Sequence, residues 1–354
     1  MLSQALTCVK KISTEKDVAA PGKDVGVLFG GKMQALLQSA FRRDIKAPEG
    51  RMLSISKRIW QIAGLLAIPL AAREALLQRL AHSDPSLFRA QKAVHGGPGQ
   101  LTGAIMMDAH SSETNFSLLH RAVLEPKSGV GAHFHNTCEE FFIIFDGEAQ
   151  FTIDGRTSVL KGPAGALCRM GHSHAIYNAT DKTVQWLNIQ VTAAKGASDS
   201  YNLDDPRVGV PLDAIPVFMT SRFDRALLQP LESMEGGKGS AQYRRVLNPS
   251  VFTTPWSYVD QVVLPAGASI GPHLHRQVGE VYYVVKGQGK LSVSTQSTGM
   301  EAASLRDGDA IALQLGELHS VENTGADPLE MLIIGVSRDR EHGTDTLNRP
   351  HFQK

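Results

Sequence analysis

The 354-residue sequence has little cysteine and almost no net charge. Its three cysteines, Cys8, Cys138 and Cys168, are widely spaced and form neither a disulfide framework nor a paired zinc-binding motif. They predict a reducing compartment such as the cytoplasm. The 36 basic and 35 acidic side chains give a net charge of +1. This balance gives no reason to expect a nucleic-acid partner or a membrane surface.

The sequence also lacks a long apolar run. The longest, residues 62–72, has 11 residues, whereas a membrane span needs about 20, so no transmembrane helix is predicted. Residues 57–81 have the pattern of an amphipathic helix, which Pro69 would kink or divide. Because the first 58 residues carry 11 Lys and Arg against 5 Asp and Glu, a transit peptide is an alternative interpretation. A secretory signal starting at Met52 is another.

Beyond about residue 111, short segments rich in Val, Ile, Phe and Tyr replace the helical pattern. The 33 glycines and 17 prolines supply turns between them, which is typical of a β architecture. Eight segments are predicted to be strands: 117–125, 140–145, 148–153, 183–191, 258–264, 280–285, 290–294 and 329–336.

The second group of predicted strands repeats the first. An offset of 140 residues carries Gly131, His133, His135, Glu140 and Gly147 onto Gly271, His273, His275, Glu280 and Gly287. An offset of 145 residues carries Gly171, His174 and Asn178 onto Gly316, His319 and Asn323. Agreement at so many polar and glycine positions predicts an internal duplication.

The repeated residues are of the types that bind metals. His133 and His135 are alternate residues of an extended segment, so their imidazoles face the same side, about 6–7 Å apart. Glu140 opens the next strand, and His174 comes from a later hairpin. The second set is His273, His275, Glu280 and His319. Three imidazole nitrogens and one carboxylate suit a divalent ion such as Fe, Mn, Ni, Cu or Zn, with up to two ions per chain.

Three neighbours of these residues have less specific interpretations. Glu139 is predicted to point outward into solvent, because Glu140 keeps the spacing of the repeat. His172 is predicted to lie at the surface or behind the ligands, with ligation as the alternative. Cys138 is predicted to be a small packed thiol rather than a redox-sensitive group.

The spacing of the histidines and glutamates resembles the two motifs of the cupin superfamily, and the chain resembles a bicupin with both metal motifs intact. Gly267, His273, His275, Glu280 and Gly287 fit the first motif, and Gly308, Gly316, His319 and Asn323 fit the second. In the first half, Lys127 stands where a glycine opens the motif, so Gly129 and Gly131 are expected to serve that turn. Arg169 and Gln314 replace the proline of the second motif.

The resemblance implies a mainly β fold of two tandem cupin barrels, of the double-stranded β-helix or jelly-roll type, with a partly helical N-terminal extension. The expected divisions are a basic segment (1–56), a helical extension (57–110), the first barrel (111–199), a linker with a short helix at 218–231 (200–250), the second barrel (251–340) and a tail (341–354).

Residues alternating with the two glutamates are expected to line a pocket in each barrel. They are Phe142 and Ile144 in the first barrel and Tyr282 and Val284 in the second. Counting leaves open whether Trp186 and Asn188, or Gln185 and Leu187, face the first pocket. Arg169 is a candidate for holding a substrate carboxylate, with an exposed turn arginine as the alternative.

The leading functional expectation is a metal-dependent dioxygenase acting on a small aromatic or carboxylate-bearing substrate. Fe(II) is favoured there, and Glu140 or Glu280 is the candidate catalytic base. The alternatives are a redox-neutral isomerase, cyclase, lyase or decarboxylase, and a non-catalytic bicupin that binds metal or sugar. A homo-oligomer is compatible with each of these functions.

Overall fold

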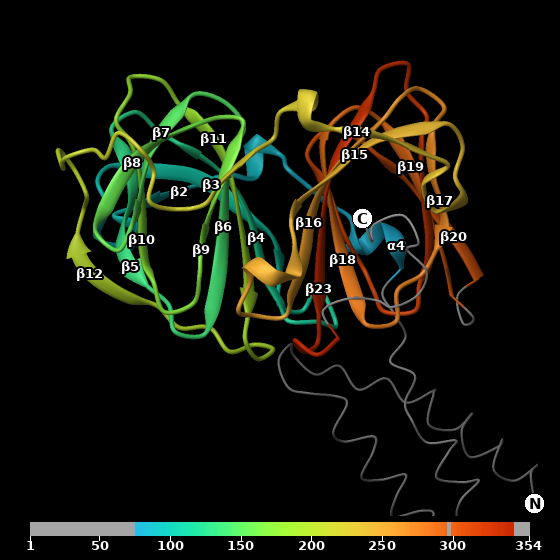
Figure 1. The fold of residues 1–354 in the computed structure, drawn as a ribbon, viewed down its shortest axis with the longest axis horizontal. Helices are drawn as coiled ribbons and strands as arrows, with labels where there is room; N and C mark the ends of the chain where they lie inside the picture. Colours follow the sequence, from blue (N-terminus) through green and yellow to red (C-terminus); the bar gives the residue numbers. More distant parts are fainter. Residues whose placement is uncertain (1–74, 296–298, 343–354) are drawn as a thin grey trace, which may run out of the picture. The chain divides into compact units, whose positions relative to one another are not determined.

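The computed structural model describes residues 75–295 and 299–342. They belong to one compact unit, Ala72–Lys354, in which two β-barrels are drawn in green and orange in Figure 1. The expected targeting segment and most of the expected helix over 57–81 lie outside the described residues. Within the described residues, no helix is long and apolar enough to cross a membrane. The cytoplasmic location stays a prediction.

The first barrel consists of a seven-stranded and a five-stranded sheet. The larger sheet has the order β13 (Thr220–Arg222), β9 (Ala164–Cys168), β6 (Cys138–Ile144), β11 (Val184–Thr192), β4 (Phe116–Leu124), β3 (Gln100–Asp108) and β2 (Arg89–Lys92). The smaller sheet has the order β12 (Tyr201–Asp205), β5 (Ser128–Phe134), β10 (Ser173–Asn178), β7 (Glu148–Ile153) and β8 (Arg156–Lys161). Side chains of both sheets, among them Phe142, Phe151 and Trp186, fill the barrel.

The second barrel repeats this arrangement with a seven-stranded and a four-stranded sheet. The larger sheet has the order β1 (Ala81–His82), β21 (Asp309–Leu313), β18 (Val278–Lys286), β23 (Leu329–Ser337), β16 (Trp256–Leu264), β15 (Ser240–Leu247) and β14 (Gln229–Glu232). The smaller sheet has the order β17 (Ser269–His273), β22 (Leu318–Asn323), β19 (Gly289–Thr295) and β20 (Gly299–Leu305). The predicted duplication and the two tandem barrels are confirmed.

All eight predicted strands are present, as β4, β6, β7, β11, β16, β18, β19 and β23, with ends that differ by at most about two residues. The expected helical extension is wrong in its described part. Helix there is limited to the single turn α4 (Leu76–Arg79) and the 3₁₀ turns η1 (Pro85–Leu87) and η2 (Val94–Gly96), and β1, β2 and β3 occupy most of the rest. The sequence did not indicate β2, because this strand is polar and mostly exposed. It therefore lacks the alternation of apolar and polar residues that marks a strand.

The short helix expected at 218–231 is also wrong. The segment holds only the 3₁₀ turn η3 (Arg225–Leu227) between β13 and β14, and the 3₁₀ turns η4 (Met234–Gly236) and η5 (Pro249–Val251) follow it. The turns η3 and η4 match η1 and η2 at the same offset of 140 residues, since η1 starts at Pro85 and η3 at Arg225. The duplication therefore begins earlier than residue 111.

Each barrel takes an outer strand from the chain that precedes the other barrel. β1 comes before the first barrel but pairs with β21 of the second, and β13 comes before the second barrel but pairs with β9 of the first. Apolar residues beside these strands follow the same exchange. Leu76 is buried in the core of the second barrel, and Phe218 packs against the Phe151 ring of the first, with 5.1 Å between ring centroids.

The outer faces of the two large sheets pack against each other through a shared apolar cluster that includes Phe141, Trp256 and Tyr283. Glu139 lies at this interface. The prediction that it is solvated is wrong, since the side chain is 0% exposed. Its carboxylate accepts hydrogen bonds from the backbone N–H and hydroxyl groups of both Thr253 and Thr254. The outer face of β6 is covered by the second barrel, which the sequence of one strand does not reveal.

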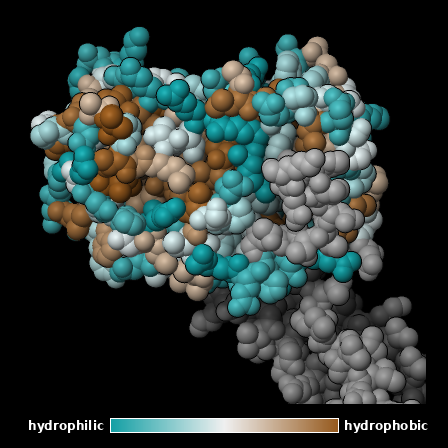
Figure 2. Space-filling view, viewed as in Figure 1, coloured by the Kyte–Doolittle hydropathy of each residue, from teal (hydrophilic) through white to brown (hydrophobic). Residues whose placement is uncertain are grey.

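The linker between the barrels exposes several large apolar side chains. Figure 2 shows apolar residues exposed on the side of the molecule that faces the viewer in Figure 1. The exposed linker residues are Tyr201, Leu203, Val208, Leu212, Ile215, Val217 and Met219. A cavity of about 1370 Å³ lies between residues 212–225 of the linker and both barrels. The expected homo-oligomer stays a prediction.

Two candidate metal centres

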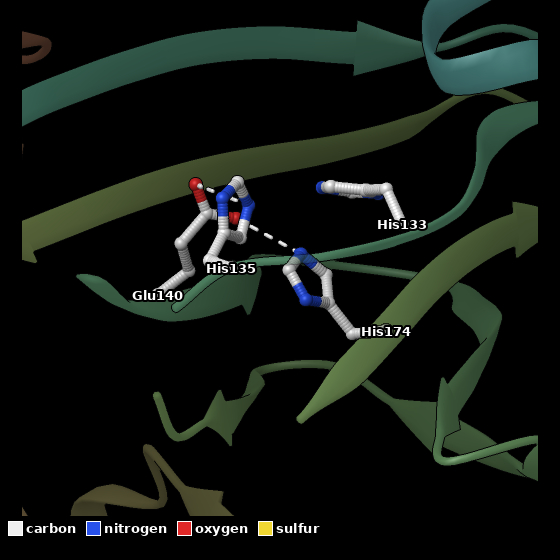
Figure 3. Close-up of side chains that lie close together, drawn as sticks. All are labelled: His133, His135, Glu140 and His174. Atoms are coloured by element: carbon white, nitrogen blue, oxygen red, sulfur yellow. Dashed lines mark hydrogen bonds and ion pairs between the residues drawn. The ribbon is translucent and has the colours of Figure 1, made fainter. Parts of the chain in front are cut away.

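The first barrel gathers the four predicted ligands at one place. His133 is the second-last residue of β5, His135 follows the strand directly, Glu140 lies in β6 and His174 in β10. One donor atom from each lies within 4.8 Å of the others, and all four residues are buried. His174 Nε2 is 3.0 Å from Glu140 Oε2, and His135 Nε2 is 3.7 Å from Glu140 Oε1. In Figure 3 the rings and the carboxylate surround a common space. We call this group the N-terminal centre.

Hydrogen bonds fix the orientation of two imidazole rings in the N-terminal centre. His133 Nδ1 donates to the Gly131 carbonyl oxygen over 2.8 Å, and His135 Nδ1 donates to the Asp199 carbonyl oxygen. Both Nε2 atoms are thereby left to accept. His135 Nε2 is buried and has no hydrogen-bond partner. A metal ligand requires a ring nitrogen whose lone pair is not already used in a hydrogen bond. His135 Nε2 meets this requirement, so these residues fit a divalent ion.

The second barrel repeats this arrangement, and we call it the C-terminal centre. His273, His275, Glu280 and His319 also bring their donor atoms within 4.8 Å of one another. Glu280 Oε2 lies 3.1 Å from His319 Nε2, 3.6 Å from His275 Nε2 and 4.0 Å from His273 Nε2. His273 Nδ1 donates to the Gly271 carbonyl oxygen over 2.8 Å. The duplication therefore preserves the orienting hydrogen bond as well as the ligands.

Burial keeps His133 and His273 neutral. It lowers the pKa of His133 to about 2 and that of His273 to about 3, with nearby histidines adding to the effect. Burial alone would raise the pKa of Glu140 and Glu280. The histidines around each carboxylate outweigh it, so the pKa of both glutamates is lowered. A neutral imidazole and an ionised carboxylate are the forms that bind a metal.

The carboxylates accept hydrogen bonds from different side chains in the two centres. Gln190 Nε2 donates to Glu140 Oε1 over 2.7 Å. The Tyr258 hydroxyl donates to Glu280 Oε1 over 2.6 Å, and the Tyr282 hydroxyl donates to Glu280 Oε2 over 3.1 Å. The sequence analysis missed Gln190 and Tyr258. The comparison of the two repeats does not single them out, because neither residue type recurs at the equivalent position.

The expected pocket residues lie inside the barrels. The Phe142 ring is 5.1 Å from the His174 ring and stacks on Trp186, and Ile144 is buried in the same core. Trp186 and Asn188 therefore share the inner face of β11, whereas Leu187 packs at the interface between the barrels. In the second barrel, Tyr282 and Val284 lie in the core. Contact of these residues with a substrate stays a prediction.

The structure also places three residues that the sequence analysis singled out, Arg169, His172 and Lys127. Arg169 is exposed after β9, and its contact with a carboxylate stays a prediction. His172 is exposed and bonds Asp154, as expected of a surface residue. Lys127 itself adopts the left-handed turn conformation, with φ of 55°. The expectation for Gly129 and Gly131 is wrong, since both lie within β5.

The two strand glycines instead allow close packing. A Cβ atom on Gly131 would come within 2.2 Å of the His95 carbonyl oxygen, and one on Gly129 within 2.3 Å of the Ile176 carbonyl oxygen. Gly131 therefore lets the turn η2 lie directly against β5. This close approach brings His95, which the sequence analysis did not single out, next to a metal ligand.

His95 and β12 cover one side of the N-terminal centre. The His95 ring stacks on the His133 ring, with centroids 3.7 Å apart and planes 9° apart. His95 Nδ1 is 2.6 Å from Asn202 Oδ1, and Asn202 is paired with His133 in the sheet. In the described part of the second barrel, β17 has no such outer neighbour, and Glu235 replaces His95 at the offset of 140.

Comparisons with known proteins agree with this architecture. The model of the cupin domain matches residues 120–190 and 260–335. An oxalate-binding protein of Thermotoga maritima is 29% identical over 116 residues, which cover 92% of that protein and 33% of this chain.

Solved structures of oxalate decarboxylases also resemble the chain. One of the Bacillus subtilis enzyme, a protein with Mn(II) centres, has a TM-score of 0.55 at 17% identity, covering 84% of this chain and 86% of that one. The Lactobacillus farciminis enzyme in complex with formate has a TM-score of 0.52 at 16% identity, covering 73% and 86%. At such identities the likeness establishes the fold alone.

Proposed function

Since the chain is a bicupin with a complete set of three histidines and one glutamate in each barrel, we propose that it is a metal-dependent enzyme of small carboxylates. The reaction we propose is redox-neutral overall, of the decarboxylase or lyase class, with oxalate as the first substrate to test. The observation that carries the proposal is that both ligand sets are buried and complete.

The donor set limits which metal to expect. His133, His135, Glu140 and His174 would hold one ion, and the four equivalent residues of the second barrel would hold the other. Three imidazoles and one carboxylate suit a divalent first-row ion without selecting one metal. A bound divalent ion would supply Lewis-acid polarisation and coordination positions for a carboxylate. Mn(II) is the first choice, because the structurally similar B. subtilis enzyme contains Mn(II).

The surroundings of the N-terminal centre suit an anionic ligand. One carboxylate and three neutral imidazoles carry a single negative charge, so a divalent ion would leave the centre positive. His95 adds an imidazole directly against His133. His95 Nδ1 donates to Asn202 Oδ1 over 2.6 Å, which holds the ring in this stacked position. The T. maritima relative, named for oxalate binding, supports the choice of substrate class.

An oxygen-dependent dioxygenase is the second candidate. The observation that favours it is the aromatic wall beside the N-terminal centre, where Phe142 lies between the rings of His174 and Trp186. An aromatic substrate would pack well on such a wall. The redox-neutral reaction ranks first, because the relatives named above bind or decarboxylate oxalate.

The test is to load the full chain with Mn(II) or Fe(II), supply oxalate or another small carboxylate, and follow CO₂ release and O₂ consumption together. CO₂ release without net O₂ consumption supports the proposal. Consumption of one O₂ per substrate, with both of its oxygen atoms recovered in the organic product, supports the dioxygenase instead. If the carboxylate changes the electron paramagnetic resonance (EPR) spectrum of Mn(II) but is not converted, the protein is a binding bicupin and the proposed reaction is wrong.

Glu140 and Glu280 are the proposed catalytic bases. Glu140→Gln and Glu280→Gln each keep the shape of the side chain but remove its ability to take a proton. We expect turnover to fall at least about 100-fold in the variant of the reactive centre. Metal content must be measured in parallel, because the same carboxylate is a ligand. Unchanged turnover at full metal occupancy in both variants would exclude the role.

A further inference from the structure

The sheet register places one residue directly opposite each metal-site glutamate. In the first barrel, Gln190 of β11 is the partner of Glu140 of β6, and on its other side Gln190 pairs with Leu118 of β4. The Gln190 side chain reaches across the inner face and donates to Glu140 Oε1 over 2.7 Å. The donor therefore comes from the strand next to the carboxylate.

In the second barrel the same three positions hold different residues. Gly335 of β23 is the partner of Glu280 of β18, and on its other side Gly335 pairs with Tyr258 of β16. Gly335 has no side chain to donate. The Tyr258 ring lies over it instead, and the hydroxyl reaches Glu280 Oε1 over 2.6 Å. A Cβ atom at position 335 would come within 2.4 Å of this ring, so the tyrosine requires the glycine.

The two barrels thus make the same hydrogen bond by exchanging residues across one cross-strand pair. Leu118 with Gln190 in one barrel corresponds to Tyr258 with Gly335 in the other. Changing only one member would lose the donor or place two side chains in the same space. From this paired exchange we infer that Gln190 and Tyr258 are positioning residues with one role. Each holds one carboxylate oxygen, Oε1, so that Oε2 stays beside the third histidine of its centre.

Neighbouring residues keep both donors in place. The Ser117 hydroxyl donates to Gln190 Oε1 over 2.8 Å and the Ser198 hydroxyl over 3.3 Å. This fixes the amide so that its NH₂ group faces Glu140. The Arg245 guanidinium lies 4.3 Å from the centroid of the Tyr258 ring. Arg245 is itself held by two hydrogen bonds to the buried Asp260 carboxylate. A donor supported in this way orients a metal ligand instead of merely filling space.

The test measures metal affinity at one centre at a time in the full chain. The His273→Ala/His319→Ala background isolates the N-terminal centre, and His133→Ala/His174→Ala isolates the C-terminal one. In these backgrounds, Gln190→Leu and Tyr258→Phe remove only the donor. We expect each to weaken Mn(II) binding at its own centre by about 10- to 100-fold, the usual effect of losing a partner of a ligand. The EPR spectrum of that Mn(II) should change too.

Matched controls face away from the centres. Gln185 lies on the same strand as Gln190, and Tyr283 lies next to Tyr282 with its ring in the interface between the barrels. Gln185→Leu and Tyr283→Phe should therefore leave Mn(II) affinity within about threefold of the parent, well below the loss expected for an orienting partner.

Exchanging the pairs tests the role directly. Leu118→Tyr with Gln190→Gly builds the tyrosine arrangement in the first barrel, and Tyr258→Leu with Gly335→Gln builds the glutamine arrangement in the second. We expect the double variants to recover most of the affinity that Gln190→Gly or Tyr258→Leu loses alone. If Gln190 and Tyr258 only filled space, this rescue would not be expected.

Two results would overturn the inference. One is unchanged affinity and an unchanged spectrum in Tyr258→Phe, which lacks a single oxygen atom and so is the variant least prone to misfold. The other is a folded double variant, checked by circular dichroism, that binds Mn(II) no better than the single variant. The inference rests on the metal binding proposed above but not on the reaction. Missing turnover with normal Mn(II) binding would refute the proposed reaction alone.

Discussion

The two barrels have identical ligand sets in nearly identical geometry but differ in what surrounds them. His133 and His273 each donate to the backbone oxygen two residues earlier, over 2.8 Å in both cases. Around Glu140 the near neighbours are an amide and two thiols, since Cys168 pairs with Glu140 and Cys138 lies two residues before it.

The surroundings of Glu280 are different. Two phenols donate to it, and the residues equivalent to the cysteines are Val278 and Leu313. The duplication therefore kept the residues that face the common space and changed those behind them. Ligand identity and orientation are constrained most strongly. The residues behind the ligands differ between the two barrels, but a hydrogen bond to the glutamate is present in both.

Coverage of the centres is a second difference. The N-terminal centre has β12 and His95 against its first histidine. In the described part of the second barrel, β17 is the outermost strand of its sheet. Such a difference changes substrate access without changing the metal ligands. We therefore expect the two centres to be alike in metal binding and unlike in reactivity.

The largest effect should come from removing ligands. His133→Ala with His174→Ala should reduce metal content from about two ions per chain to about one, and His273→Ala with His319→Ala should do the same, because two of four donors are lost. Elemental analysis after dialysis measures this. His110→Ala is the control, since His110 is exposed outside both centres. Full metal content in either double variant would show that the predicted ligands are wrong.

Acid should destabilise both barrels of the metal-free protein. Burial lowers the pKa of His273 to about 3 and that of His133 to about 2, from 6.5. The unfolded chain binds more protons than the native chain between those values and pH 6.5, so the free energy of unfolding decreases as pH falls through this range. Each histidine contributes up to about 1.4 kcal/mol per pH unit.

Urea unfolding at pH 7, 6, 5 and 4 in the presence of a chelator measures this dependence. Replacing His133 and His273 by Leu should make it shallower, whereas His110→Ala should not. A stability that does not change between pH 6.5 and 4 would contradict the prediction.

The exchanged segments should stabilise the barrel on which they pack. Leu76 is 1% exposed in the core of the second barrel, whereas its neighbour Leu77 is 67% exposed. We expect Leu76→Ala to lower the free energy of unfolding by about 2–5 kcal/mol. Leu77→Ala should change it by less than about 0.5 kcal/mol. Thermal or urea unfolding distinguishes them, and equal effects would show that Leu76 does not anchor the segment.

The smallest effect is expected from the thiols beside the N-terminal centre. Cys138 is buried, and burial together with nearby carboxylates raises the pKa of its thiol, so it behaves as a small apolar residue. Cys138→Val copies the second barrel. It should change the free energy of unfolding by less than about 1.5 kcal/mol and leave Mn(II) affinity unaltered. The reciprocal Val278→Cys is its control. A large loss of Mn(II) at the N-terminal centre would assign the thiol a role in binding.

The duplication, the ligands and most of the central strands could be predicted from the order of the residues alone. These features are local, because His133 and His135 need only an extended backbone to face one side, and β6 and β18 alternate clearly. The first strands of each repeat were missed, since β2 and β14 are short, mostly exposed and polar.

Other features follow only from the three-dimensional arrangement. They are the barrel that each early segment joins, the burial of Glu139 against Thr253 and Thr254, and the stacking of His95 on His133. The hydrogen bonds that Tyr258 and Gln190 donate to the two glutamates from different strands are another such feature. Each of these depends on contacts between residues distant in sequence. Such contacts follow from sheet register and barrel packing, and neither of these is encoded within a single strand.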